Sequence, residues 1–141
     1  MPYCSVFLFI SILLVATACT RSPYQDGARV YTSYCANCHM DSGEGLGALI
    51  PPLNGADYLV INHDQLPCLV RYGLQDTIIV NGKTYAEAMP PADQLSDIDI
   101  TNVLNYINTH FGNNNRIFTL SEVRAGLNKC SPLPLPRKEG E

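Results

Sequence analysis

The stretch Cys35-Ala36-Asn37-Cys38-His39 determines how the rest of this chain is interpreted. Two thiols spaced three residues apart at the end of a helical turn can each add to one vinyl group of a haem. The adjacent histidine then lies beneath the iron as a ligand. We therefore predict that Cys35 and Cys38 hold one haem c covalently and that His39 is an axial ligand of its iron.

The alternative interpretation of this motif is half of a zinc site, completed by Cys68, His63 or His110, or a redox dithiol. The chain has no second C-x-x-C string and no H-x-x-x-H string, and the motif lacks the βαβ context of a thioredoxin-like site. Haem attachment is therefore the favoured interpretation.

Length and composition limit the remaining possibilities. The 141 residues suffice for one compact domain with a tail. Hydrophobic residues make up 46% and charged residues 16%, which excludes a disordered chain. Nine basic against thirteen acidic residues give a net charge of -4, so we expect no nucleic-acid partner.

The N-terminus has the pattern of an export signal. Residues Val6 to Ala16 are apolar apart from Ser11, and Ala-Thr-Ala ending at Ala18 is a small-residue cleavage site. We predict a signal peptide at 1–18, although no basic residue precedes Arg21; an uncleaved membrane anchor is the alternative. Val15-Ala16-Thr17-Ala18-Cys19 also resembles a bacterial lipobox, which implies a lipid on Cys19 and a membrane-anchored protein on the periplasmic side.

The cysteine count bears on the same question. Six cysteines occur, and cleavage of the signal removes Cys4 and leaves five. The haem motif uses two. If Cys68 and Cys130 pair in an oxidising compartment, Cys19 is left over, either lipidated or idle. This disulfide closes a loop that stabilises the fold by about 4 kcal/mol on the loop-entropy model.

Residues 22–112 resemble a small single-haem class I cytochrome c. Gly27 and Tyr31 match the family's Gly-x-x-x-aromatic pattern on the first helix, and Val103-x-x-Tyr106-Ile107 matches the contact on the last helix. The resemblance implies an all-α cytochrome c fold in which these helices cross. A small β-hairpin at 78–85, marked by Asn81-Gly82, is expected near the methionine loop.

The same resemblance implies two further site residues. Ile50-Pro51-Pro52-Leu53 resembles the segment whose proline carbonyl accepts a hydrogen bond from the proximal histidine, which assigns that role to Pro51. Of the candidate distal ligands Met40, His63, His110 and Met89, the last stands in an Ala-Met-Pro string similar to the family's methionine loop. We therefore expect His39 and Met89 to ligate the iron.

Local patterns divide the chain into a signal at 1–18, a cytochrome domain at 19–112, an appendage at 113–130 and a tail at 131–141. Helices are expected to begin with capping boxes at Ser22 and Thr119, with an N-cap at Ser96, and to end before Gly73. The last domain helix is expected to present one apolar face made of Ile100, Val103, Leu104, Ile107 and Phe111.

The predicted function is one-electron transfer in an extracytoplasmic respiratory or redox chain, without enzymatic activity. Residues 35–111 carry two basic and nine acidic side chains, so we expect redox partners with basic docking faces. Three alternatives remain: a haem-based sensor or peroxidase-like enzyme with a labile distal ligand, a haem-free metal-stabilised module, and a subunit of an oxidase or dehydrogenase.

Overall fold

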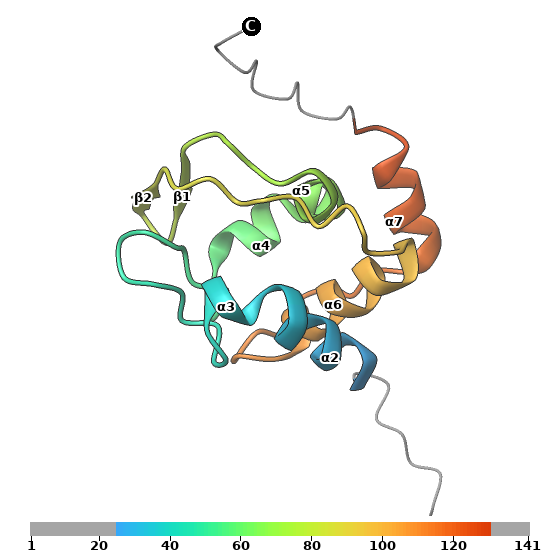
Figure 1. The fold of residues 1–141 in the computed structure, drawn as a ribbon, viewed down its shortest axis with the longest axis horizontal. Coiled ribbons are helices and arrows are strands. Elements are labelled where there is room, and N and C mark those ends of the chain that lie inside the picture. The colour runs from blue at the N-terminus through green and yellow to red at the C-terminus, as the bar shows by residue number, and fades with distance from the viewer. Residues whose placement is uncertain (1–24, 131–141) are drawn as a thin grey trace, which may run out of the picture.

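The computed structural model describes residues 25–130, and within this range it is helical with one antiparallel hairpin (Figure 1). The predicted all-α architecture with one small hairpin is confirmed. The elements are α2 (Gln25–Tyr34), α3 (Ala36–His39), α4 (Asp57–Ile61), a 3₁₀ turn η1 (His63–Gln65), α5 (Leu66–Tyr72), β1 (Ile78–Val80), β2 (Lys83–Tyr85), α6 (Asp97–Thr109) and α7 (Leu120–Leu127).

Several predictions concern segments outside the described residues. These are the signal peptide at 1–18, lipidation of Cys19, the capping box at Ser22 and the tail at 131–141. Between residues 25 and 130, none of the helices has the length and apolar character needed to cross a membrane.

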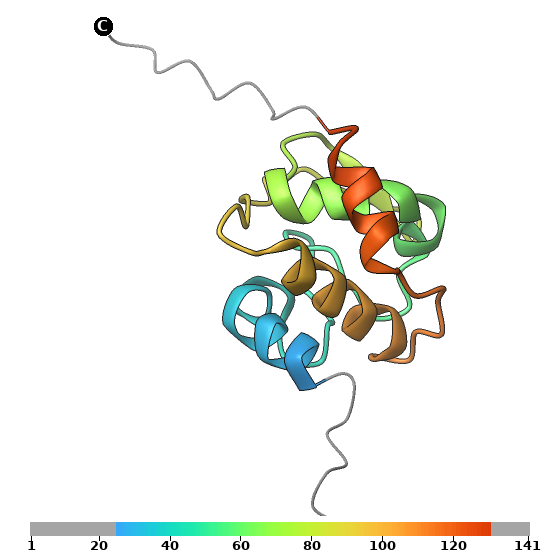
Figure 2. The ribbon, with the colours of Figure 1, turned by 90° about the vertical axis from the view of Figure 1, so that its right-hand side faces the viewer.

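The most extensive helix contact joins α2 to α6, as the resemblance implied (Figure 2). A methyl group at Gly27 would meet the Asn102 carbonyl oxygen and lie 2.7 Å from Tyr106 Cβ. Only glycine therefore lets the two backbones approach this closely. Beside the crossing, the buried Tyr31 ring packs 5.5 Å from the Tyr106 ring and 5.0 Å from the Phe111 ring.

The capping box predicted at Thr119 forms, and the N-cap predicted at Ser96 is also a capping box. The Ser96 hydroxyl accepts from the Asp99 backbone at the start of α6, and the Thr119 hydroxyl accepts from the Glu122 backbone at the start of α7. Each satisfies an amide that the helix itself leaves unpaired. The two helices therefore begin at the positions that the sequence indicated.

The prediction that Phe111 lies on the apolar face of the last domain helix is wrong. Helix α6 ends at Thr109, His110 is its C-cap, and Phe111 has a φ of 55°. The Asn113 side-chain amide donates to the Ile107 carbonyl oxygen at 2.9 Å. This bond satisfies a carbonyl at the end of the helix, and Phe111 reaches Tyr31 from the turn that follows.

The hairpin lies beside α4. Asn81 and Gly82 have φ values of 51° and 75°, which are the left-handed values that a two-residue type I′ turn needs. Asp57 and Asn81 exchange two hydrogen bonds, from each backbone amide to the other's side-chain oxygen, at 3.0 and 2.7 Å. These bonds fasten the turn to the first residue of α4.

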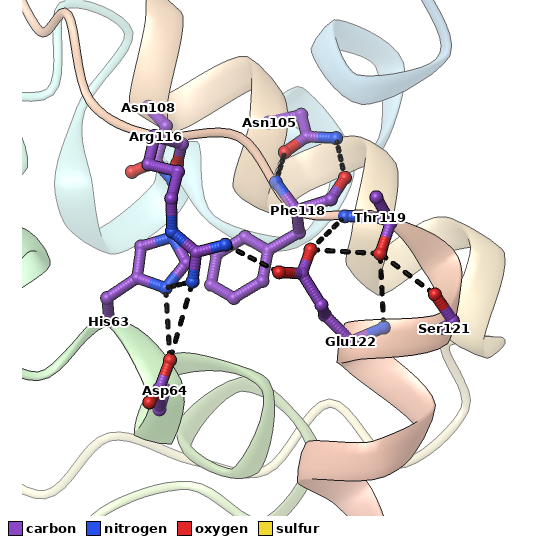
Figure 3. Close-up of polar contacts among 9 residues, drawn as sticks. All are labelled: His63, Asp64, Asn105, Asn108, Arg116, Phe118, Thr119, Ser121 and Glu122. Carbon is purple, nitrogen blue, oxygen red and sulfur yellow. Dashed lines mark hydrogen bonds and ion pairs between the residues drawn. The ribbon is translucent and has the colours of Figure 1, made fainter.

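The appendage packs against α5 and α6, and a disulfide joins Cys68 of α5 to Cys130 after α7. The His63 ring stacks on Phe118 at 3.8 Å, and Nε2 of His63 lies 3.0 Å from the Arg116 carbonyl oxygen (Figure 3). The His63 side chain is only 11% exposed. It anchors the segment that leads into α7.

Two glycines test the helix crossing. Gly27→Ala should lower the free energy of unfolding by about 1–3 kcal/mol, because the added methyl overpacks the contact with α6. Gly126→Ala is the matched control, since its methyl would lie 3.6 Å from the nearest atoms, an ordinary contact. We expect this helical Gly→Ala change to stabilise the protein by up to about 1 kcal/mol in urea unfolding. Equal effects of the two changes would contradict the close crossing.

The capping box of α7 predicts a pH dependence. The Thr119 amide and the Arg116 side chain bond the Glu122 carboxylate and lower its pKa to about 2, below its usual 4.5. The carboxylate therefore stabilises the fold above pH 4.5, and this contribution is lost as the pH falls towards 2. In urea unfolding at a series of pH values, Glu122→Gln should flatten this part of the stability curve. Parallel curves for the two proteins would contradict the role of the carboxylate.

Candidate functional site

An apolar cavity lies between the helices, and the four predicted haem-site side chains Cys35, Cys38, His39 and Met89 all line it. Its walls are mainly aliphatic and come from four elements: Leu59 of α4, Leu66 and Val70 of α5, Val80 of β1, and Leu104 and Ile107 of α6. The fold thus gathers sulfur and nitrogen donors into a largely apolar space.

Cys35 and Cys38 lie where α2 passes into α3. The Cys35 amide donates to the Tyr31 carbonyl oxygen at 2.8 Å, and the His39 amide donates to the Cys35 carbonyl oxygen at 2.9 Å. This continuous turn places both thiols on the cavity, and neither forms a disulfide. Burial, and secondarily the neighbouring Cys38, raises the pKa of Cys35 to about 11, so its thiol is neutral at pH 7.

The imidazole of His39 is fixed in one orientation. Its Nδ1 lies 3.0 Å from the Pro51 carbonyl oxygen, and the residue is 9% exposed. Burial lowers the pKa of His39, although the hydrogen bond to Pro51 opposes this shift. A neutral ring that donates from Nδ1 keeps a free lone pair on Nε2, which is the form that ligates a metal.

The loop after His39 is tight enough to bring Pro51 back to it. The Gly45 amide donates to the His39 carbonyl oxygen at 3.0 Å, and Gly45 has a φ of 71°. A methyl at Gly45 would lie 2.6 Å from the Pro51 carbonyl oxygen, the same oxygen that faces His39. The glycine here therefore permits a close backbone approach.

Met89 reaches the cavity from a segment fifty residues after His39. Its backbone forms an isolated antiparallel bridge with Leu74, with hydrogen bonds of 2.9 and 2.8 Å. Pro90 and Pro91 follow and also line the cavity. Both backbone polar groups of Met89 are thus hydrogen-bonded.

The other candidate distal ligands lie elsewhere. Met40, His63 and His110 do not line the cavity. The Met40 carbonyl oxygen accepts a 2.6 Å hydrogen bond from the Tyr31 hydroxyl, and the His110 ring stacks on Tyr106 at 4.0 Å. Within residues 25–130, Met89 is therefore the donor that shares the cavity with His39.

The alternative zinc site does not assemble. Cys68 is bonded to Cys130, and His63 packs on Phe118. Among the described residues, no three His, Cys, Asp or Glu side chains group together as a metal site would require. The donor set of two unpaired thiols, one oriented imidazole and one thioether around an apolar cavity instead fits a covalently attached haem.

Sequence analysis missed Asn113. Its side-chain amide donates to the Leu53 carbonyl oxygen at 2.8 Å, and its side-chain oxygen accepts from the Gly55 amide at 2.9 Å. The residue therefore ties the chain that follows Pro51 to the end of α6. No local signal predicts this role, because an Asn in a turn carries no information about partners about sixty residues away.

The fold and the cavity define a haem protein of the c type. A family model described as cytochrome c oxidase, cbb3-type, subunit III matches residues 22–107. The chain is 35% identical over 127 residues to a cytochrome c-552 of Thermus thermophilus, covering 84% of this chain and 80% of the relative. A second Thermus thermophilus cytochrome c-552 is 37% identical over 108 residues, which are 70% of this chain and 82% of the relative.

A third relative is the cytochrome c subunit of a quinone alcohol dehydrogenase from Gluconobacter oxydans. It is 39% identical over 93 residues, which are 62% of this chain and 19% of the relative. The chain belongs to the c-type cytochrome family. It binds haem c covalently and functions in electron transfer with redox partners, and it is an electron carrier and not an enzyme.

Proposed function

We propose that this chain carries single electrons through one haem, attached to Cys35 and Cys38 and ligated by His39 and Met89. The observation that supports the proposal is the shared cavity in which these four side chains meet. The chain has one C-x-x-C-H string, which argues for one haem. When bound, the haem supplies a one-electron redox couple at its iron.

The residues around the haem would tune the reduction potential of its iron. Pro51 holds the imidazole of His39 with Nδ1 as the donor, which strengthens His39 as a ligand. The largely apolar walls would lower the dielectric around the haem, and a low dielectric favours the less charged state of the site. If His39 and Met89 both held the iron, no position on it would be left open, and the site would favour electron transfer over a sensor or peroxidase-like enzyme.

The negative charge of the haem-bearing stretch favours redox partners with basic surfaces. Residues 35–111 carry a net charge of -7, with Arg71 and Lys83 as the basic side chains. Arg71 is paired with Asp97 at 2.8 Å, so it adds little positive potential to the surface. We propose that the redox partners present basic faces, which would steer association.

A second candidate function is service as a subunit of a larger redox complex. The matching family model describes an oxidase subunit, and the Gluconobacter relative is named as a dehydrogenase subunit. The chemistry at the haem is the same in both cases. The candidates differ only in whether the partner binds permanently.

We also propose that the protein is exported and tethered to the membrane on the periplasmic side through a lipid on Cys19. The apolar stretch and the lipobox-like string at Val15–Cys19 support this proposal. The tether would keep the carrier near partners in an extracytoplasmic redox chain. Stable tethering requires more than one acyl chain.

The proposed ligand set predicts a spectroscopic signature. The oxidised protein should show a thioether–iron charge-transfer band, and Met89→Ala should abolish it and lower the reduction potential, because a methionine ligand raises that potential. Met40→Ala is the matched control and should keep the band. A band that persists in Met89→Ala would contradict the assignment.

The proposed tether is tested by metabolic labelling with a palmitate analogue in a bacterial host that processes lipoproteins. The wild-type protein should take up label, and Cys19→Ser should lose it. Cys4→Ser is the control: Cys4 lies within the predicted signal peptide, so this variant should still take up the label. Equal labelling of the Cys19→Ser protein would overturn lipidation at this residue.

A further inference from the structure

We infer that α5 and the Cys68–Cys130 disulfide form a brace that positions the Met89 sulfur. The inference rests on the proposed function, because it takes Met89 to be an iron ligand.

The segment around Met89 is bonded mainly to α5 and to the residues that end it. The Leu74 amide donates to the Met89 carbonyl oxygen at 2.9 Å, and the Met89 amide donates to the Leu74 carbonyl oxygen at 2.8 Å. Three residues later, the Ala92 amide donates to the Val70 carbonyl oxygen at 3.0 Å. Backbone bonds to this one region thus bracket the turn that contains Pro90 and Pro91.

Gly73 brings this region into direct backbone contact with the methionine segment. It is the C-cap of α5 and has a φ of 74°. A methyl at this position would collide with the Met89 carbonyl oxygen and would lie 2.9 Å from the Pro91 nitrogen. A displacement of α5 would therefore displace Met89, since no side chain lies between them to absorb the movement.

Helix α5 depends on its neighbours for its own position. It has seven residues and no side-chain cap at its N-terminus, and an isolated helix of that length is not stable in water. Figures 1 and 2 show α7 packed alongside it. The disulfide from Cys68 to Cys130 makes that contact covalent, with the two Cα atoms 5.8 Å apart.

The appendage itself is firmly seated, so it can serve as the fixed end of the brace. The backbone of the buried Phe118 is bonded at both its N–H and its C=O to the side chain of Asn105 on α6, at 2.7 and 2.9 Å. The Arg116 guanidinium lies 3.0 Å from His63 Nδ1 (Figure 3). A continuous path therefore runs from α6 through the appendage and the disulfide to α5 and Met89.

The test measures how often Met89 leaves the iron. In the oxidised holoprotein, imidazole at saturating concentration replaces the thioether at a rate limited by its departure. In the double variant Cys68→Ser, Cys130→Ser, imidazole should displace the thioether about tenfold faster. A disulfide that closes a loop of this length stabilises the folded protein by more free energy than a tenfold change in rate requires. Gly73→Ala, at the other end of the brace, should also accelerate it.

Gly27→Ala is the matched control, because it weakens the α2–α6 crossing and removes none of the bonds that join α7, α5 and Met89. At equal or greater loss of unfolding free energy, it should change the replacement rate by less than about twofold. If the double serine variant does not mature, the disulfide of the matured wild-type protein is reduced, its thiols are blocked with N-ethylmaleimide, and the iron is re-oxidised before the same measurement.

Two results would overturn the inference: a rate within about twofold of wild type when the disulfide is absent, or an equal acceleration in Gly27→Ala. Failure of the proposed function is distinguishable from both. If the wild-type protein lacks the thioether–iron band, the ligand assignment itself is wrong. If the band is present and the rates do not change, only the brace is wrong.

Discussion

One apolar cavity has to receive a histidine and a methionine from segments fifty residues apart, and the structure is organised around that constraint. The two donors are supported in different ways. His39 is fixed by local bonds to Gly45 and Pro51, within twelve residues of itself. Met89 has no comparable local support, and its backbone is held by Leu74 at the end of a short helix. The methionine side therefore depends on tertiary packing.

The features that were predictable from sequence are those encoded by neighbouring residues. The C-x-x-C-H string, the Ser96 and Thr119 caps and the Asn81-Gly82 turn each specify their own conformation, and the structure has all of them at the expected positions. The role of Gly27 was also predictable. A glycine inside a helix lowers the stability of that helix, and a close contact with another helix explains why it is present.

The features that were missed depend on contacts across the chain. Periodicity placed Phe111 on α6, but the helix ends two residues earlier, at Thr109, and the Asn113 side-chain amide bonds the Ile107 carbonyl oxygen near its end. His63 has no sequence neighbour that reveals its stacking on Phe118, and nothing near Leu74 indicates a bridge to Met89. The proposed site residues carry sequence motifs, whereas the residues that hold the backbone of Met89 carry none.

The central claim is that Cys35 and Cys38 hold a haem covalently in this cavity. The most direct test is the alkaline pyridine haemochrome spectrum of protein from a host with c-type maturation, after extraction with acidified acetone. The account predicts that the haem stays with the polypeptide and gives the spectrum of two saturated vinyl groups, and that a Cys35→Ala, Cys38→Ala double variant retains none. A colourless wild-type protein, or haem that extracts freely, would contradict it.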